Sequence, residues 1–270
     1  MTQESKLEKQ HATRLGWPEL QTSFEKWVNR TYPDGAHAET SSARITHQFA
    51  MGRVEEGRGV GQWFLRHGHA GRVLDISAGN GGVSIGMANF AAFDVTAADI
   101  VINQDLFSLR RDVPLPVTQV AANGHNLPFR SATFDIILCL DTVEHVPQPE
   151  LLAAEIMRVL RRGGLCMITT PARLRHLFGR DPHYGIPGLL LLPDRLQRAV
   201  GSFLLGRTTS YDVEHIFWSV DEITSLFSRH APVGVDVLWN HNWPGPVSIR
   251  EFLWHRYRHW WWDRIVIRKE

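Results

Sequence analysis

The alternation of apolar strand-like runs with helix-like stretches is the feature that most constrains the fold of this chain. The alternation begins at Arg72, and its apolar runs are RVLDI, FDVTAA, VTQVAA, FDIILCL and LCMITT, at residues 72–76, 93–98, 117–122, 134–140 and 165–170. Several runs are apolar at nearly every position, which is typical of strands covered on both faces. Strands that alternate with helices in this way predict an α/β fold with a doubly wound parallel sheet.

One helix within this alternation is marked by residues that start and stop helices. Pro149 suits the first turn of a helix, and Gly163-Gly164 is expected to close it. Between these signals, apolar residues recur at helical spacing. They are Leu152, Ile156, Val159 and Leu160.

The C-terminal part of the chain carries its own signals. Ser219 and Glu222 have the spacing of a capping box, which predicts a helix over Ile223, Leu226 and Phe227. Residues 233–239 (VGVDVLW) predict another strand. The last segment could be a strand or a helix, and we favour a helix because its large apolar residues fall on one helical face. They are Leu253, Trp254, Tyr257, Trp260, Trp261 and Ile265.

These signals divide the chain into four segments. Residues 1–70 are expected to be an N-terminal helical extension or cap, with a mobile lead over residues 1–16. Residues 71–171 are expected to be the core. Residues 172–215, rich in Pro, Gly, His and Leu, interrupt the alternation, and an insertion of that length predicts a lid over a substrate site. Residues 216–270 are expected to complete the core.

Composition excludes several classes of protein. The formal net charge is +1, and no basic stripe marks the core, so no nucleic-acid partner is expected. Cys139 and Cys166 are too few for a disulfide scaffold or a four-cysteine zinc site, and both lie in apolar runs typical of buried thiols. The N-terminus lacks an apolar signal core, and the apolar stretch 185–206 is broken by prolines and charges. We therefore expect a cytoplasmic protein.

The stretch VLDISAGNGG, residues 73–82, carries the strongest functional signal. An apolar strand ends in an acid, Asp75, and a Gly-x-Gly turn follows at Gly79 and Gly81, where glycine lets the backbone approach a ligand closely. The dinucleotide fingerprint G-x-G-x-x-G fails here, because its third glycine would fall at Ser84. Asp99, at the end of the next strand, is placed so that its carboxylate can accept both hydroxyls of a ribose.

With these residues in view, the sequence resembles the class I S-adenosylmethionine (SAM)-dependent methyltransferases, including ubiquinone-pathway and small-molecule enzymes. The resemblance covers about residues 70–171 and rests on three blocks in the right order. They are VLDISAGNGG, NGHNLPFRSATFDIILCLDTVEHV and EIMRVLRRGGLCMITTP. The resemblance implies a Rossmann-like, mostly parallel sheet of seven strands with helices on both faces. It also implies SAM as the cofactor and S-adenosylhomocysteine as the product.

Carried over position by position, the resemblance implies a set of cofactor-binding residues. Asp75 would order the loop, and backbone at Ser77, Ala78, Gly79 and Gly81 would line the methionine moiety. Asp99 would hold the ribose. The remaining expected contacts are Ile100 and the pair Asn123 and Gly124 at the adenine, and Leu140 and Asp141 beside the sulfonium.

Three residues depart from the family pattern. Ser77 stands where the family has its first glycine, so its backbone would need a compatible angle. Asn123 replaces an Asp, and its amide oxygen can still accept a hydrogen bond from the adenine amine with less charge assistance. Arg162 replaces a proline before Gly163-Gly164, and this change is expected to matter little.

The candidate catalytic residues are His145, His183 and Tyr184. His145 follows the fourth strand, and imidazole titrates near neutrality, which suits a general base. His183 and Tyr184 lie in the expected lid, as do the further polar candidates Tyr211 and His215, and His241 and Trp243 are expected at the same rim. A structural hydrogen bond is the alternative for each.

No metal ion is expected at the site. The alternative is a divalent metal held by Asp141, Glu144 and His145, whose carboxylates and imidazole are suitable ligand types.

The acceptor is predicted in class only. The apolar lid favours a small-molecule, glycan or lipid-linked acceptor, methylated most readily at oxygen. The tryptophans and arginines of residues 252–268 could form an amphipathic helix at a membrane surface, or could pack on the protein body instead. The alternatives are an N- or C-methyltransferase acting on an amine or quinone-like ring, and a catalytically silent SAM-binding scaffold. The sequence indicates no oligomeric state.

Overall fold

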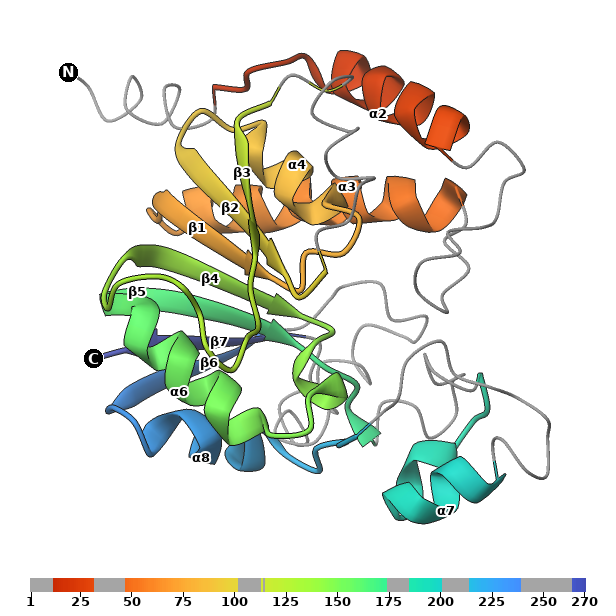
Figure 1. The fold of residues 1–270 in the computed structure, drawn as a ribbon, viewed down its shortest axis with the longest axis vertical. Coiled ribbons are helices and arrows are strands. Elements are labelled where there is room, and N and C mark those ends of the chain that lie inside the picture. Colours follow the sequence, from red (N-terminus) through yellow and green to blue (C-terminus); the bar gives the residue numbers. More distant parts are fainter. Residues whose placement is uncertain are drawn as a thin grey trace, which may run out of the picture. The chain divides into compact units, whose positions relative to one another are not determined.

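The structure is a computed structural model that describes residues 12–31, 47–101, 113, 115–173, 185–200, 214–238 and 264–270. These residues contain a seven-stranded sheet in the order β3-β2-β1-β4-β5-β7-β6 (Figure 1). The strands are β1 (Gly71–Ile76), β2 (Phe93–Asp99), β3 (Val117–Ala121), β4 (Phe134–Leu140), β5 (Leu160–Thr169), β6 (Val233–Leu238) and β7 (Arg264–Lys269).

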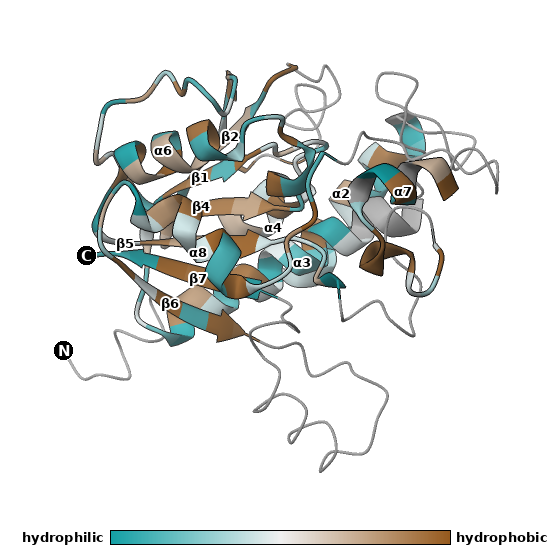
Figure 2. Cartoon of the chain, turned by 90° about the horizontal axis from the view of Figure 1, so that it is seen from below, coloured by the Kyte–Doolittle hydropathy of each residue, from teal (hydrophilic) through white to brown (hydrophobic). Residues whose placement is uncertain are grey.

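The sheet is mostly parallel, as predicted. Strand β1 pairs in parallel with β2, and β2 with β3, whereas β7 pairs antiparallel with both β5 and β6. Figure 2 shows hydrophobic residues along β4 and β7, and the buried residues of both strands are almost all apolar. The helices are α2 (Trp17–Thr31), α3 (His47–Arg66), α4 (Gly82–Ala88), α6 (Pro149–Val159), α7 (Asp194–Arg198) and α8 (Val220–Ser228), with 3-10 turns η1 (Val143–His145) and η3 (Leu189–Leu191).

The chain forms two compact units, Met1–Leu138 and Cys139–Glu270. In the first unit, the residues just before α2 are fixed to the end of α4. The Arg14 guanidinium donates to the carbonyl of Ala88 at 2.6 Å, and the Arg14 and Leu15 amides bond to the backbone and side-chain oxygens of Asn89. The expected mobile lead is therefore wrong for residues 13–15, which are held by side-chain and backbone bonds far along the chain; residues 1–11 lie outside the described part.

Helices α3 and α4 of this unit pack closely because glycine lies at their contact. A Cβ placed on Gly57 of α3 would collide with the backbone carbonyl of Val83 on α4, and one on Gly86 of α4 would collide with that of Val54 on α3. Gly59, also on α3, has nothing within 4 Å of its Cβ position. The contact between the helix before β1 and the helix that follows the loop after β1 thus depends on bare backbone.

In the second unit, α6 begins at Pro149 as predicted but ends earlier than expected. It ends at Val159, and β5 begins at the next residue, so Gly163 and Gly164 lie inside the strand and do not close the helix. Leu160, counted as a helical residue from its spacing, is the first residue of the strand. Gly163 has a φ of 74°, a left-handed conformation inside the strand that glycine adopts without strain.

The C-terminal helix is also a wrong prediction where the structure describes it. Residues 264–269 form β7, and Ile265 pairs with Ile168 of β5 on one side and Val237 of β6 on the other. The run Ile265-Val266-Ile267 is β-branched throughout and completely buried, which suits a strand between two others. Residues 239–263, with the other members of the expected helical face, lie outside the described part.

The helix after the capping box is confirmed. Ser219 Oγ accepts a hydrogen bond from the Glu222 amide at 3.2 Å, and Ile223, Leu226 and Phe227 are buried on α8. Glu222 does not return the bond to Ser219; its carboxylate accepts from the Trp218 amide at 2.7 Å.

A buried arginine at the start of the insertion, Arg173, links separate described parts of this segment. Arg173 donates to the carbonyls of Leu190 and Leu192 at 2.7 and 2.8 Å, and to the carbonyl of Ile216 at 2.9 Å. The guanidinium thereby binds the start, the middle and the return of the insertion together. That residues 172–215 act as a lid stays a prediction. No helix among the described residues is long and apolar enough to span a membrane.

The glycine contact between α3 and α4 makes a stability prediction. We expect Gly57→Ala to lower the free energy of unfolding by about 1–3 kcal/mol, because the new methyl group meets backbone that cannot move aside. Gly59→Ala, on the same helix, should raise it by about 0.5–1 kcal/mol through reduced chain entropy. Urea unfolding of both variants measures this, and equal effects of the two substitutions would contradict the packing described.

Candidate functional site

The loop between β1 and α4 presents bare backbone to solvent. Ser77 and Gly79 are exposed, and Ser77, Gly79 and Gly81 all have positive φ, at 58°, 54° and 76°. The Ala78 amide donates to the carbonyl of Ala98 on β2 at 3.1 Å, so the loop is fastened to the neighbouring strand. The sequence required a compatible angle at Ser77, and the structure gives this residue the left-handed backbone that glycine adopts more easily.

Asp99 holds this loop from the end of β2. Its Oδ2 accepts a hydrogen bond from the Gly79 amide at 2.9 Å, and its Oδ1 accepts from the Val101 amide at 3.3 Å. A carboxylate has about four acceptor positions, so these two bonds leave room for the hydroxyls of a ligand. The structure therefore brings Asp99 and Gly79 together, and the role of Asp99 at a ribose stays a prediction.

Asp75 is bonded to the helix that follows the loop. Its Oδ2 accepts a hydrogen bond from Ser84 Oγ on α4 at 2.6 Å, so it joins the end of β1 to the helix that follows the loop. Burial raises the pKa of Asp75 to about 6, although the Ser84 hydroxyl and the positive charge of Arg53 oppose this rise. Ser84 stands where the dinucleotide fingerprint would place a glycine, and here its hydroxyl is used.

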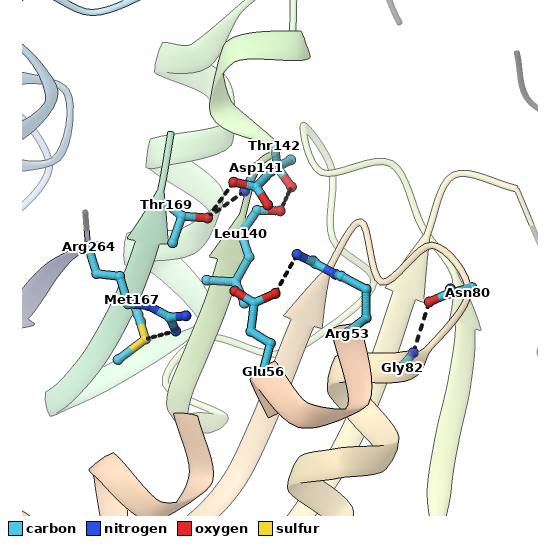
Figure 3. Close-up of polar contacts among 10 residues, drawn as sticks. All are labelled: Arg53, Glu56, Asn80, Gly82, Leu140, Asp141, Thr142, Met167, Thr169 and Arg264. Atoms are coloured by element: carbon cyan, nitrogen blue, oxygen red, sulfur yellow. Dashed lines mark hydrogen bonds and ion pairs between the residues drawn. The ribbon is translucent and has the colours of Figure 1, made fainter. Parts of the chain in front are cut away.

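Helix α3 supplies charged residues that the sequence reasoning missed. Arg53 and Glu56 form an ion pair at 2.6 Å, and a Cβ placed on Gly82 would lie 2.7 Å from Arg53 Cβ, so this part of α3 lies against the loop. Asn80 Oδ1 accepts from the Gly82 amide at 3.0 Å, as Figure 3 shows. Asn80 Nδ2 is buried and has no hydrogen-bond partner among the described residues. Sequence patterns did not reveal Arg53 and Glu56 as neighbours of the loop, because they lie more than 20 residues before it.

The ends of β2 and β3 carry the residues expected at an adenine ring. Ile100 is 68% exposed and Val101 is 61% exposed, which leaves an apolar surface uncovered beside Asp99. The Ala122 amide donates to the Asp99 carbonyl at 2.8 Å, which keeps the start of the next loop close. Asn123 is exposed, and its Oδ1 already accepts a hydrogen bond from the His125 amide at 2.9 Å. Its side chain therefore also shapes the turn that includes Gly124.

In the second unit, the ends of β4 and β5 are clamped together through Asp141. The Asp141 amide donates to Thr169 of β5, and Thr169 Oγ1 donates to Asp141 Oδ1 at 2.8 Å (Figure 3). Asp141 has a φ of 52°, so it too takes the left-handed conformation, directly after the buried Leu140. The exposed carboxylate is thus fixed in position at the carboxyl end of β4.

Glu144 and His145 follow in the short turn η1. The Glu144 side chain is 1% exposed, and burial, together with the negative charge of Asp141, raises the pKa of Glu144 to about 8. His145 is more accessible, and its Nε2 lies 3.9 Å from Glu144 Oε1. Over the described residues, no three His, Cys, Asp or Glu side chains gather in a way that could hold a metal ion, so Asp141, Glu144 and His145 do not form such a group.

The candidates from the insertion are described only in part. His183, Tyr184, Tyr211, His241 and Trp243 lie outside the described residues. His215 is described, and its Nε2 lies 3.4 Å from Glu222 Oε1. The amphipathic helix over 252–268 is wrong for residues 264–268, which belong to β7, and the rest of that segment is outside the described part.

The buried Asp75 gives a pH prediction. Because its folded pKa is above the usual value, the folded state holds this proton more tightly, so its contribution to stability is full below about pH 4 and is lost as pH rises to about 6. The loss is about 3 kcal/mol at 1.36 kcal/mol per pKa unit. In urea unfolding, the free energy of unfolding of Asp75→Asn should rise relative to that of wild type between pH 4 and 7, whereas that of the exposed Asp94→Asn should not. Parallel curves of this free energy against pH for wild type and Asp75→Asn would contradict the burial of Asp75.

Comparison with known proteins adds a family to this geometry. Residues 74–168 match the family model described as a methyltransferase domain. An uncharacterized methyltransferase of Mycobacterium avium is 31% identical over 147 residues, which are 47% of this chain and 56% of that protein. A ubiquinone biosynthesis O-methyltransferase of Paraburkholderia phytofirmans is 32% identical over 116 residues, which are 40% of this chain and 49% of that protein. Other relatives are named as C-methyltransferases.

The matched region is therefore limited to part of each protein, and the chain spans about half the length of the curated relatives it matches. Among solved structures, a Pyrococcus horikoshii protein is similar with a TM-score of 0.57 at 18% identity, covering 90% of this chain and 98% of the other. That likeness concerns the fold alone.

Proposed function

We propose that residues 74–168, which match the family model described as a methyltransferase domain, form the core of a class I, SAM-dependent methyltransferase, and that the chain transfers a methyl group from SAM to an oxygen of a small-molecule, glycan or lipid-linked acceptor. The observation that carries this proposal is the Gly79–Asp99 hydrogen bond, which places a carboxylate beside an exposed stretch of bare backbone. In an open α/β sheet, ligands bind beyond the carboxyl ends of the strands, and both groups lie there.

The residues of this loop fit an adenosyl ligand. Asp99 has acceptor capacity for ribose hydroxyls, and the exposed Ile100 side chain offers an apolar surface on which an adenine ring could stack. The backbone at Ser77–Gly79 is open, and the only side chains along it are the small ones of Ser77 and Ala78. These leave space for the amino-acid part of SAM. The buried Asn80 Nδ2, without a partner among the described residues, is a donor suited to a ligand oxygen.

The charge of α3 supports binding of the amino-acid part. Arg53 approaches the loop at Gly82 and could bind the SAM carboxylate, while Glu56 keeps its guanidinium in place at 2.6 Å. An ion pair with a carboxylate is among the stronger polar contacts that arginine makes. We propose Arg53 as a cofactor-binding residue on these grounds.

When bound, SAM supplies an electrophilic methyl group on its sulfonium. The task of the chain is then to hold donor and acceptor in line and to exclude water, which can supply about 7–11 kcal/mol of the barrier. A hydroxyl acceptor also benefits from a base that takes its proton, and we propose His145 for this role because its ring is accessible and lies next to Glu144. The roles of His183 and Tyr184 stay predictions.

A second candidate is methyl transfer to carbon or nitrogen. Some relatives are named as O-methyltransferases and others as C-methyltransferases, so their names do not decide the acceptor atom. The choice depends on the residues expected near the acceptor. We infer oxygen because the charged and polar groups there, at Asp141, His145 and Thr169, suit a hydroxyl. Contact of residues 252–263 with a membrane remains a proposal.

Arg53 is tested with a matched control from the same helix. Arg58 pairs with Glu55 at 3.7 Å over the same i,i+3 spacing. We expect Arg53→Gln to weaken binding of S-adenosylhomocysteine about 10-fold or more, and to leave binding of 5′-methylthioadenosine, which lacks the amino-acid part, unchanged. Arg58→Gln should change neither affinity in calorimetry; equal losses for both ligands in Arg53→Gln would refute the assigned contact.

A substitution at Asp99 is expected to weaken both ligands, whereas Arg53→Gln should weaken only the one with an amino-acid part. Both adenosyl ligands carry the ribose, so Asp99→Ala should weaken each of them by about 1–3 kcal/mol through lost hydrogen bonds to a charged group. The same titrations measure this effect. Unchanged affinity for 5′-methylthioadenosine would mean that Asp99 does not hold the ribose.

Methyl transfer itself is tested with isotopically labelled SAM and a cell extract, with mass spectrometry of the products. We expect a product with one added methyl ether or ester group, and a fall of about 10²–10⁴-fold in its rate of formation for His145→Gln with unchanged affinity for S-adenosylhomocysteine. The exposed His230→Gln is the control. A methylated amine or ring carbon as the product would show that the acceptor atom is nitrogen or carbon and not oxygen. An unaltered rate in His145→Gln would show that His145 is not the base.

A further inference from the structure

Two Asn-Gly sequences occur in the chain, and the structure places them in different environments. They are Asn80-Gly81, in the loop after β1, and Asn123-Gly124, after β3. In such a sequence the backbone nitrogen of the glycine can attack the side-chain carbon of the asparagine, because glycine has no side chain that restricts its backbone or covers this nitrogen. Asparagine is for this reason one of the chemically labile residues of proteins. Whether the attack takes place in a folded chain depends on the freedom of the two groups.

At Asn80 both groups are fixed. The Asn80 side chain is buried, and its Oδ1 accepts a hydrogen bond from the Gly82 amide at 3.0 Å. The attacking group would be the Gly81 amide, which donates to the carbonyl of Ala78 at 2.8 Å. Attack at Asn80 would therefore require this loop to break both hydrogen bonds and to open.

At Asn123 the attacking group is available. Asn123 is exposed, and within the described part of the chain the Gly124 amide donates no hydrogen bond. Asn123 Oδ1 accepts a hydrogen bond from the His125 amide at 2.9 Å, which folds the side chain back over the backbone of Gly124. The same bond favours attack, because it stabilises the negative charge that develops on this oxygen. The two groups are thus close to each other and open to water.

We propose that Asn123 is a site of spontaneous deamidation, and that the fold protects Asn80 from the same reaction. The Gly124 nitrogen loses its proton to hydroxide and forms a bond to Asn123 Cγ, and the bond from Cγ to Nδ2 breaks as this nitrogen takes a proton from water and leaves as ammonia. Water then opens the cyclic imide. Breaking the new bond to Cγ gives aspartate, and breaking the original peptide bond gives isoaspartate. Each event consumes one water and releases one ammonia, without oxidation or reduction.

The modification changes both the charge and the backbone of this turn. Either product puts a carboxylate in the place of the neutral Asn123 amide, and isoaspartate also adds one carbon to the main chain before Gly124. The neighbouring Ala122 amide donates to the carbonyl of Asp99 at 2.8 Å, so the altered turn is joined to the residue proposed for the ribose. Isoaspartate should therefore weaken binding of an adenosyl ligand. This consequence rests on the proposed function, whereas the modification itself does not.

The test keeps the full chain in a mildly alkaline buffer made with water enriched in the heavy oxygen isotope, with one sample folded and one in guanidinium chloride. Samples taken over days are digested, and mass spectrometry of the peptides locates each new carboxyl group. We expect Asn123 of the folded chain to react within about 10-fold of its rate in guanidinium chloride, and Asn80 to react about 100-fold or more slowly than in guanidinium chloride, because its loop must first open. Both aspartate and isoaspartate should form at position 123.

The chain offers matched controls. Asn126 is exposed in the same turn as Asn123, but Leu127 follows it, and the leucine side chain covers the attacking nitrogen. Asn126 should therefore stay unmodified, which separates the effect of glycine from that of exposure. Asn123→Gln would have to close a larger ring, so this variant should show no mass gain at position 123. Calorimetric titration with S-adenosylhomocysteine before and after the incubation measures the effect on ligand binding.

Three results would overturn the proposal. An Asn123 that stays unmodified in the folded chain but reacts in guanidinium chloride would show that the fold protects it too. Equal rates at Asn80 and Asn123 in the folded chain would show that the hydrogen bonds of the first loop give no protection. Aspartate without isoaspartate at position 123 would show direct hydrolysis instead of attack by Gly124. Affinity for S-adenosylhomocysteine that does not change with the modification would instead contradict the adenosyl contact at this turn, because the modification is measured by mass.

Discussion

The hydrogen bond from the Gly79 amide to the Asp99 carboxylate is the interaction on which the site depends. It joins the loop after β1 to the end of β2 at 2.9 Å, and the backbone bond from Ala78 to Ala98 strengthens the same link. The loop contains Ser77 in a left-handed conformation, which costs an L-residue about 1–2 kcal/mol. The two bonds to β2 help to hold this strained loop in its open conformation.

The carboxyl groups around the strand ends have contrasting environments. Asp99 and Asp141 are partly or fully accessible, and each accepts hydrogen bonds that fix it at a strand end. Asp75 and Glu144 are buried, and burial raises the pKa of each, to about 6 and about 8. Burial therefore separates these acids, because it raises the pKa of Asp75 and Glu144, whereas the carboxylates of Asp99 and Asp141 reach the surface.

The strands could be predicted from sequence because their burial is local and complete. The apolar runs at 72–76, 93–98 and 134–140 coincide with β1, β2 and β4 to within one residue. Two local patterns misled: helical spacing continued past Val159 into β5, and the aromatic C-terminal pattern included Ile265, which is a strand residue. In both cases the pairing of the strand with its neighbours outweighed a helical period that the sequence also contains.

The site could be predicted only for residues that lie in or next to a recognisable local sequence pattern. The loop residues and Asp99 follow from the order of strand, turn and strand, whereas Ser84 as the partner of Asp75, Arg53 beside the loop and Thr170 beside Glu144 depend on contacts made by packing. No local pattern encodes such pairs. A search for polar residues at the ends of consecutive predicted strands would have drawn attention to Thr169 and Thr170.

The central claim is that the loop held by Asp99 binds the adenosyl group, and a crystal structure with S-adenosylhomocysteine tests it most directly. The account predicts the ribose hydroxyls within hydrogen-bond distance of the Asp99 carboxylate and the amino-acid part along the backbone of Ser77–Gly79. Density for the nucleoside elsewhere, with the Gly79–Asp99 bond intact and the loop uncovered, would contradict it.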